Sequence, residues 1–185
     1  MKQDYTLRKI RADEAQQFFD LRVLGLRTDP QVFVATLDEE LQLSLQDVEN
    51  YLVKNYVLGA FDECGDLIGT LVYMEQERQK FKHIGILGGM YVHPQHRGFG
   101  LARKLLELML VNLQKYDPTP EGCPGKQSLR DRHLVGLQLK VVTTNVPAIR
   151  LYETAGFSIW ATEKNALCSD GNFFDQHHMM MPLAC

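Results

Sequence analysis

The sequence lacks the marks of several large classes of protein. Lys and Arg number 20 against 23 for Asp and Glu, the net charge is −3, and the basic residues are scattered, so no nucleic-acid-binding patch is indicated. No stretch approaches the roughly 20 apolar residues that span a bilayer. No apolar signal-peptide core follows the first residues. We therefore expect a soluble cytoplasmic protein without nucleic-acid or membrane partners.

Patterns for disulfides and metals are missing as well. The cysteines lie far apart and form no Cys-x-x-Cys pair, so we expect free thiols at Cys64, Cys123, Cys168 and Cys185. His177 and His178 are adjacent, and neighbours in a strand point to opposite faces. We therefore predict no metal site.

Nucleotide-binding motifs are incomplete. The turn at Gly98 and Gly100 lacks the third glycine of the dinucleotide motif. Residues 125–127 (GKQ) lack both the Ser or Thr and the upstream glycine of a P-loop. These absences count against a nucleotide-binding protein.

What is present suits one well-buried domain over residues 1–185, because 185 residues with 45% hydrophobic content are enough for one core and short for two. Capping patterns at Asp13, Thr36, Ser44 and Asn145 predict helix starts. The expected helices cover 14–27, a short turn after 36, the segment from 44 to about 54, 101–115, and a segment after 145 closed by Gly156. Expected strands cover 5–10, 56–61, 67–75, 86–92, 134–143, 157–162 and 173–181. This mixture predicts an α+β or mixed α/β domain.

Three further segments carry expectations. Gly88 and Gly89 inside the central strand predict a β-bulge or a close approach of ligand or backbone. Proline and glycine in Tyr116 to His133 predict a long loop, whose role the sequence leaves open. Acidic residues crowd the helix starts in residues 38–49, either to complement helix dipoles or to form an acidic rim for a cationic substrate.

The chain is organised around a strand, a glycine turn and a helix within residues 86–113. Pro94 stops the strand, Gly98 and Gly100 allow close approach of the backbone, and a helix begins at Leu101. A helix N-terminus has unpaired N–H groups and a partial positive charge, which suits phosphate. Two glycines can also make a mere turn, but their place beside Arg97 favours an anion site.

Two segments together resemble the GNAT superfamily of acyl-CoA-dependent N-acetyltransferases. Residues 92–102 (VHPQHRGFGLA) match its Arg/Gln-x-x-Gly-x-Gly/Ala signature at Arg97, Gly100 and Ala102. A second register, at Gln95, Gly98 and Gly100, also fits, but the distance from strand to turn favours the first.

The second segment, residues 145–157 (NVPAIRLYETAGF), resembles the family's Asn-x-x-Ala-x-x-x-Tyr-x-x-x-Gly-Phe pattern. Asn145, Ala148 and Tyr152 share one face of a helix. Weaker likeness in residues 21–40 and 170–183 extends the resemblance over nearly the whole chain, with the long loop as the departure.

The resemblance implies a fold and a cofactor. The fold is a mixed α/β (α+β) one, with a central mixed β-sheet of about seven strands flanked by helices and splayed between the fourth and fifth strands. Acetyl-CoA is the implied co-substrate, with pantetheine in the gap. The implied cofactor contacts are backbone groups of Met90 and Val92, the amides of Arg97, Gly98, Phe99, Gly100, Leu101 and Ala102 for pyrophosphate, and Asn145 for the pantetheine arm.

The resemblance also implies direct attack of a neutral amine on the thioester in a ternary complex. Tyr152 matches the family's tyrosine and is the expected general acid. The central strand holds no glutamate, so His83 or Glu75 is the candidate base. An exposed strand-end histidine is at least as good an interpretation of His83, and a solvated hairpin carboxylate is a better interpretation of Glu75.

We expect a small-molecule or peptide primary amine as acceptor, and a monomer or homodimer. The alternative is a catalytically silent acyl-CoA-binding or sensor domain, which the missing glutamate keeps open.

Overall fold

The computed structural model describes residues 4–115 and 134–183. Seven strands form one sheet in the order β1-β2-β3-β4-β5-β7-β6. All neighbours are antiparallel except β4 and β5, which are parallel. The strands are β1 (Tyr5–Lys9), β2 (Tyr56–Asp62), β3 (Leu67–Glu75), β4 (Ile84–Val92), β5 (Gly136–Val142), β6 (Ser158–Ser169) and β7 (Asn172–Pro182). The predicted loop at Tyr116 to His133 lies outside the described residues.

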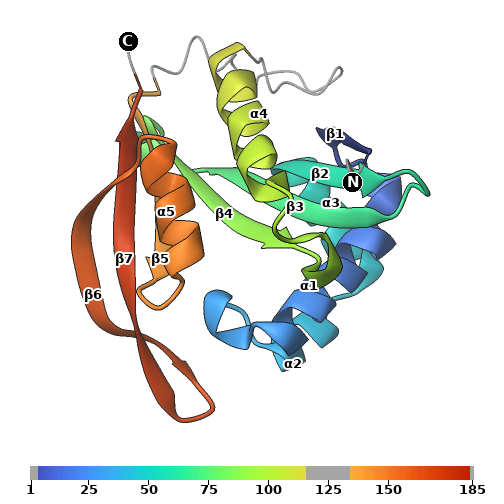
Figure 1. Cartoon of the computed structure of the whole chain (residues 1–185), viewed down its shortest axis with the longest axis horizontal. Coiled ribbons are helices and arrows are strands. Elements are labelled where there is room, and N and C mark those ends of the chain that lie inside the picture. The colour runs from blue at the N-terminus through green and yellow to red at the C-terminus, as the bar shows by residue number, and fades with distance from the viewer. Residues whose placement is uncertain (1–3, 116–133, 184–185) are drawn as a thin grey trace.

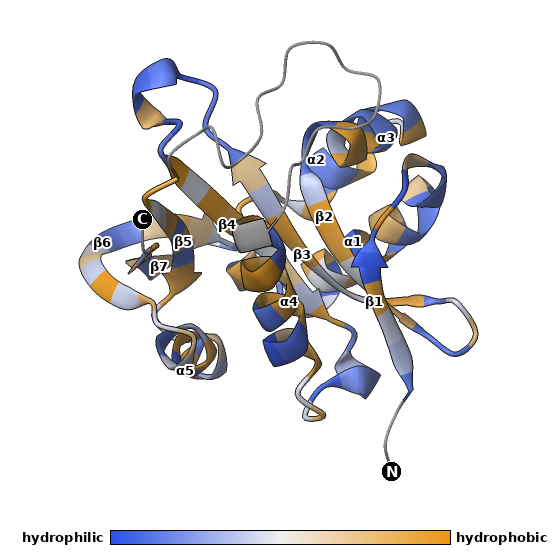
Figure 2. Ribbon diagram, turned by 90° about the horizontal axis from the view of Figure 1, so that it is seen from above, coloured by the Kyte–Doolittle hydropathy of each residue, from blue (hydrophilic) through white to orange (hydrophobic). Residues whose placement is uncertain are grey.

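Helices cover both faces of the sheet (Figures 1 and 2). On one face lie α1 (Ala15–Thr28), α2 (Leu37–Leu41) and α3 (Leu45–Lys54); on the other lie α4 (Leu101–Lys115) and α5 (Val146–Thr154). Leu105, Leu106 and Met109 of α4 are completely buried against the sheet together with Leu137 of β5. A second core joins α1 and α3 to the opposite face. The sheet therefore lies between two apolar cores, one on each face.

Two of the predicted helix starts are capping boxes. The Thr36 and Ser44 hydroxyls accept hydrogen bonds from the amides of Glu39 and Asp47, and these two carboxylates accept in return from the backbone N–H of Thr36 and Ser44. Asn145 caps α5 through Oδ1, which accepts from Ala148 N at 3.2 Å. Each cap satisfies amides that a helix start leaves unpaired.

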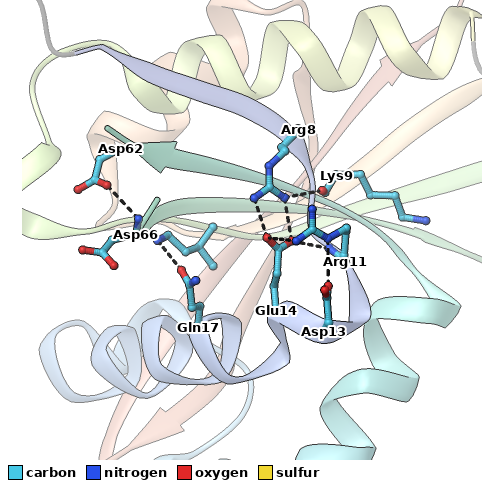
Figure 3. Close-up of polar contacts among 9 residues, drawn as sticks. Arg8, Lys9, Arg11, Asp13, Glu14, Gln17, Asp62 and Asp66 are labelled. Carbon is cyan, nitrogen blue, oxygen red and sulfur yellow. Dashed lines mark hydrogen bonds and ion pairs between the residues drawn. The ribbon is translucent and has the colours of Figure 1, made fainter. Parts of the chain in front are cut away.

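The predicted cap at Asp13 is wrong, because Glu14 organises this corner instead (Figure 3). The Glu14 carboxylate accepts two hydrogen bonds from Arg8, at 2.6 and 2.8 Å, and one from Arg11 N at 2.8 Å. A short 3-10 turn over Ala12–Glu14 therefore precedes α1. Asp13 bonds only the Arg11 side chain, at 3.0 Å.

The central strand carries the predicted bulge. The register with β3 shifts between Thr70 and Val72, and Gly89 has a φ of 58°, which favours glycine. The Thr70 hydroxyl donates to Gly89 O at 3.0 Å and fixes the bulge.

Just before the bulge, β4 separates from its parallel neighbour β5. The two strands pair only over Ile84–Ile86 and Gly136–Gln138, although β4 continues to Val92 and β5 to Val142. The predicted splay between the fourth and fifth strands is thus confirmed, and backbone groups of both strands become available to a ligand.

The β6–β7 hairpin turns at Asp170 and Gly171 as predicted, but β6 runs to Ser169 rather than Thr162. Its register shifts between Glu163 and Leu167, where Asn165 has a φ of 53°. Most of β6 is exposed, so its polar sequence shows no strand alternation.

The findings on free thiols, membrane-spanning helices and metal clusters cover the described residues alone. Cys64 and Cys168 are exposed free thiols, while Cys123 and Cys185 lie outside the described residues. No helix within residues 4–115 and 134–183 is long and apolar enough to cross a membrane. In the same ranges no three His, Cys, Asp or Glu residues are grouped to hold a metal ion.

Candidate active site

A cavity of about 610 Å³ lies where β4 and β5 separate. Most of the wall comes from the connection between α1 and α2 (32–35), β4 (86–90), β5 (138–142), α5 with its cap (145, 148 and 152) and the β6–β7 hairpin (160, 176 and 178). Single residues of α1, α2, α3 and β3 complete it: Arg22, Glu39, Tyr51 and Met74. A cavity of this size and mixed lining is typical of a small-molecule site.

Tyr152 brings its phenol to this cavity from α5. The side chain is 7% exposed and packs edge-on against Phe157, with ring centroids 5.9 Å apart. Burial raises the pKa of Tyr152 to about 12, because phenolate would lose its hydration. The phenol is therefore fully protonated at neutral pH, as a general acid must be.

The other predicted cofactor residues divide into two groups. Met90 and Asn145 line the cavity with Tyr152. Val92, at the end of β4, and residues 97–102, in the turn and the first residues of α4, are not among the residues that line it. The strand β4 joins the groups, so a long ligand can touch both.

The turn leaves room for an anion. Gly98 and Gly100 have φ values of 84° and 78°, and a Cβ placed on either would meet no atom within 4 Å. The α4 N-terminus follows at Leu101, so its first amides and its partial positive charge face this open space. The residues present therefore fit a pyrophosphate.

The Arg97 side chain stabilises the turn through hydrogen bonds within the protein. Its Nε donates to Val92 O at 2.9 Å and a terminal nitrogen donates to Asp29 at 2.7 Å, while the guanidinium lies over the Tyr91 ring. Its backbone N–H donates to Pro94 O at 3.3 Å. Arg97 is thus engaged by the protein, and the amides available to an anion are those that follow it.

The two predicted candidate bases lie elsewhere. Glu75 and His83 are exposed and line a neighbouring, wider hollow of about 970 Å³ at the other end of β4. The structure does not bring either of them together with Tyr152 in the same cavity.

The comparison with protein families decides the identity. The model of a family described as an acetyltransferase (GNAT) domain matches residues 54–159, which include β4, the glycine turn, α4 and the whole of α5 with Tyr152. The chain belongs to the GNAT acetyltransferase family. The predicted family and fold class are thereby confirmed. The family is one of acetyl-CoA-dependent acyltransferases, as the sequence analysis expected.

Similar proteins agree with this assignment. Mycothiol acetyltransferase of Acidothermus cellulolyticus is 38% identical over 80 residues, which are 42% of this chain and 20% of that protein. The chain thus matches only a fifth of that relative's length.

Solved structures extend the likeness to nearly the whole fold. A GNAT acetyltransferase of Streptococcus pneumoniae has a TM-score of 0.76 at 22% identity, covering 97% of this chain and 100% of that one. A GNAT phosphinothricin acetyltransferase of Sinorhizobium meliloti in complex with acetyl-CoA has a TM-score of 0.74 at 17% identity, covering 97% and 88%. At these identities the likeness shows the fold alone.

Sequence reasoning missed the wall opposite the GNAT tyrosine. Gln176 and His178 line the cavity from β7, and Trp160 lines it from β6. Gln176 is 5% exposed as a residue and lines the cavity, and among the described residues no hydrogen bond to its side-chain amide is found. Its amide is therefore available to a polar group of a ligand. Because side chains alternate along a strand, Gln176 and His178 lie on one face of β7. The sequence alone does not show that this face meets the cavity, because that depends on β7 lying beside β5.

A buried ion pair joins α1 and α2 beside the cavity, and its arginine, Arg22, lines the cavity. Arg22 donates to Glu40 through Nε at 2.6 Å and through a terminal nitrogen at 2.7 Å, and Glu40 is 4% exposed. Burial alone would lower the pKa of Arg22, but the hydrogen bonds to Glu40 raise it above its ordinary value. Such a forked pair sets the place of α2 and of Glu39 on the cavity rim.

Proposed function

We propose that this GNAT protein transfers the acetyl group of acetyl-CoA to a primary amine by direct attack in a ternary complex. The single observation that carries the proposal is the Tyr152 phenol in the wall of a cavity that opens between the separated β4 and β5. We also propose that residues 1–185 act as one domain, since one sheet includes strands from Tyr5 to Pro182.

The donor would lie along β4. Its pyrophosphate would lie on the amides after Arg97 at the α4 N-terminus, and its pantetheine would lie between β4 and β5, within reach of Asn145. The thioester would then meet the bulged backbone of Gly88 to Met90. Backbone N–H groups there stabilise the oxyanion that forms when an amine attacks.

Proton transfers complete the reaction. One proton leaves the acceptor ammonium before attack, the nitrogen forms its bond to the carbonyl carbon, and the C–S bond breaks. The departing sulfur takes the proton of Tyr152, and the second amine proton returns to the phenolate. Because the pKa of Tyr152 is about 12 and a simple thiol has a pKa of about 8.5, a free phenolate is unfavourable. We therefore propose that the two transfers are concerted.

The experiment has two steps. Acetyl-CoA at saturation should raise the melting temperature, because a ligand that binds only the native state stabilises it. Free-CoA release is then measured with a panel of 2-phenylethylamine, spermidine, glycinamide and a peptide with a free N-terminus. Turnover that Tyr152→Phe lowers supports the proposal. Binding without turnover on any amine would instead favour a silent acyl-CoA-binding domain.

A further inference from the structure

We propose that His178 is the base that removes the proton of the acceptor ammonium, with Glu163 as its positioning residue. This inference rests on the proposed function and assigns the half of the reaction that Tyr152 leaves open. His178 lies on β7 and lines the same cavity as Tyr152, which comes from α5.

A carboxylate fixes the His178 ring. The Nε2 atom lies 2.8 Å from Glu163 Oε2 on β6, and the ring stands edge-on to Trp160 at 5.4 Å between centroids. An ionised carboxylate only accepts hydrogen bonds, so Nε2 carries the ring proton and Nδ1 has the free lone pair. No described residue hydrogen-bonds Nδ1. This arrangement, a base oriented by a third group, is the general pattern of catalytic imidazoles.

The carboxylate is itself held in its charged form. Hydrogen bonds from His178 and from Lys140, whose Nζ lies 3.3 Å from Oε2, lower the pKa of Glu163. Lys140 stands directly opposite His178 in the β5–β7 register. The negative charge of Glu163 therefore balances a positive charge on Lys140 or on His178. It can stabilise the imidazolium that forms when His178 takes the proton of the acceptor ammonium.

The other titratable groups on the cavity wall are poor bases. Within the described residues these are Arg22, Glu39, Tyr51, Lys140 and Tyr152. The arginine and lysine carry no acceptor when charged, and burial raises the pKa of Tyr51 as it does that of Tyr152. Hydrogen bonds from the Thr36 backbone and hydroxyl lower the pKa of Glu39, which makes it a weaker base. Imidazole as a class changes charge between about pH 5 and 8, so His178 is the suitable acceptor.

The acceptor would approach between apolar surfaces. Phe33 and the exposed Val34 lie on one side of the cavity, and the exposed Trp160 lies on the other. The unpaired Gln176 amide lies two residues from His178 on the same face of β7 and can receive a polar group of the acceptor. An amine carried on an apolar group would therefore fit the space beside His178.

The neighbouring histidine supplies a matched control. His177 points to the opposite face of β7, where its Nδ1 lies 2.8 Å from Thr162 Oγ1, and it does not line the cavity. His177→Gln and His178→Gln therefore make the same chemical change in adjacent positions of one strand.

The experiment measures kcat/KM between pH 6 and 9.5 for the full chain with the amine of the panel that releases CoA fastest. His178→Gln should lower kcat/KM about a hundredfold at pH 7, since general-base catalysis contributes a factor of about 10² to 10⁴. The loss should shrink as pH approaches the pKa of the amine, which then deprotonates without help. His177→Gln should stay within about threefold of wild type at every pH.

Two results would overturn the inference alone: a His178→Gln enzyme within threefold of wild type at pH 7, or a loss that is the same at every pH, which marks a structural role. Release of no CoA by the wild type with the whole panel would overturn the proposed function and, with it, this inference.

Glu163→Gln gives an independent measurement if His178→Gln fails to fold. Loss of the negative charge removes the group that orients the ring and balances its positive charge, so kcat/KM should fall across the pH profile. An unchanged profile would remove Glu163, and its partner His178, from the assigned roles.

Discussion

The two sides of the cavity are built in different ways. The donor side consists of the end of β4, the glycine turn, the start of α4 and α5, all within residues 84–115 and 145–154. Of the described residues on this side that line the cavity, Tyr152 is the one with a titratable side chain. The proposed acceptor side consists of α1, α2, the connection between them and the β6–β7 hairpin. It presents side chains, including Glu39, Trp160, Gln176 and His178.

The difference concerns what each side must recognise. A pyrophosphate and an amide chain are the same in every GNAT reaction, and backbone groups at a helix N-terminus suffice for them. An acceptor amine differs between enzymes and needs specific side chains. The two sides meet near the end of β4. There Arg97 in the turn pairs with Asp29, and Tyr91 contacts both the Thr28 hydroxyl, at 2.9 Å, and the Phe33 ring.

The largest effect should come from the buried pair of the acceptor side. Glu40→Gln leaves Arg22 without its carboxylate, and breaking a buried pair costs about 3 kcal/mol of unfolding free energy or more. Urea denaturation measures the loss. The matched Glu39→Gln changes the exposed neighbour and should cost far less. Equal losses would mean that the acceptor side does not depend on this long-range contact.

Tyr152→Phe should lower kcat by about a hundredfold, which is typical of losing a general acid, and leave acetyl-CoA affinity unchanged. Steady-state kinetics with calorimetric binding separates the two quantities. The control is Tyr5→Phe, because the Tyr5 hydroxyl is buried without a hydrogen-bond partner among the described residues and lies on β1, away from the cavity. A kcat that changes equally in both variants would contradict the assigned role.

Arg97→Ala should raise the KM for acetyl-CoA about fivefold, because losing hydrogen bonds worth about 1 kcal/mol loosens the turn before the donor binds. Saturation curves for acetyl-CoA measure the change. Arg103→Ala removes an exposed pair with Glu107 on the same helix and should leave KM unchanged. An unaffected Arg97→Ala enzyme would show that the turn keeps its shape without the guanidinium.

The smallest effect concerns Asp29. Burial opposes ionisation of this carboxyl, but hydrogen bonds from Arg97 and Thr28 lower its pKa below the ordinary value. The stabilisation is therefore present at pH above the unfolded pKa of about 3.9 and is lost as pH falls through the folded pKa. Asp29→Asn should cost less than about 1 kcal/mol at pH 7 and nothing at pH 2.

Urea titrations of Asp29→Asn at both pH values measure this dependence. Asp66→Asn, in the exposed loop between β2 and β3, is the control and should show no such dependence on pH. A cost for Asp29→Asn that persists at pH 2 would refute the ion pair as its source.

The donor side can be predicted from the sequence because its signals are local. Pro94, Gly98 and Gly100 determine where a strand stops and a helix begins, and Asn145 to Gly156 fixes the start and end of α5. The family resemblance rests on the same two segments. The bulge at Gly89 was predictable for the same reason.

The acceptor side cannot be predicted in this way. His178 meets Glu163 only because β6 and β7 pair across fifteen residues, and it meets the cavity only because β7 inserts between β5 and β6. The candidate bases His83 and Glu75 are close to the central strand in sequence, but they line the hollow beside the start of β4 and not the cavity that contains Tyr152. The helix cap predicted at Asp13 is wrong for a similar reason, because Arg8 on the preceding strand β1 hydrogen-bonds the Glu14 carboxylate.

Calorimetric titration with acetyl-CoA tests the central claim, that the glycine turn and the α4 N-terminus hold the donor. Gly100 and Gly65 have φ values of 78° and 86° and both have open space around a Cβ, but Gly65 lies in the loop between β2 and β3. Valine at either position carries the same backbone strain, of about 1 to 2 kcal/mol, so the pair isolates the ligand contact. We predict one site per wild-type chain, binding at least about tenfold weaker (about 1.4 kcal/mol) in Gly100→Val, and unchanged binding in Gly65→Val. No binding by the wild type, or equal weakening in both variants, would contradict the account.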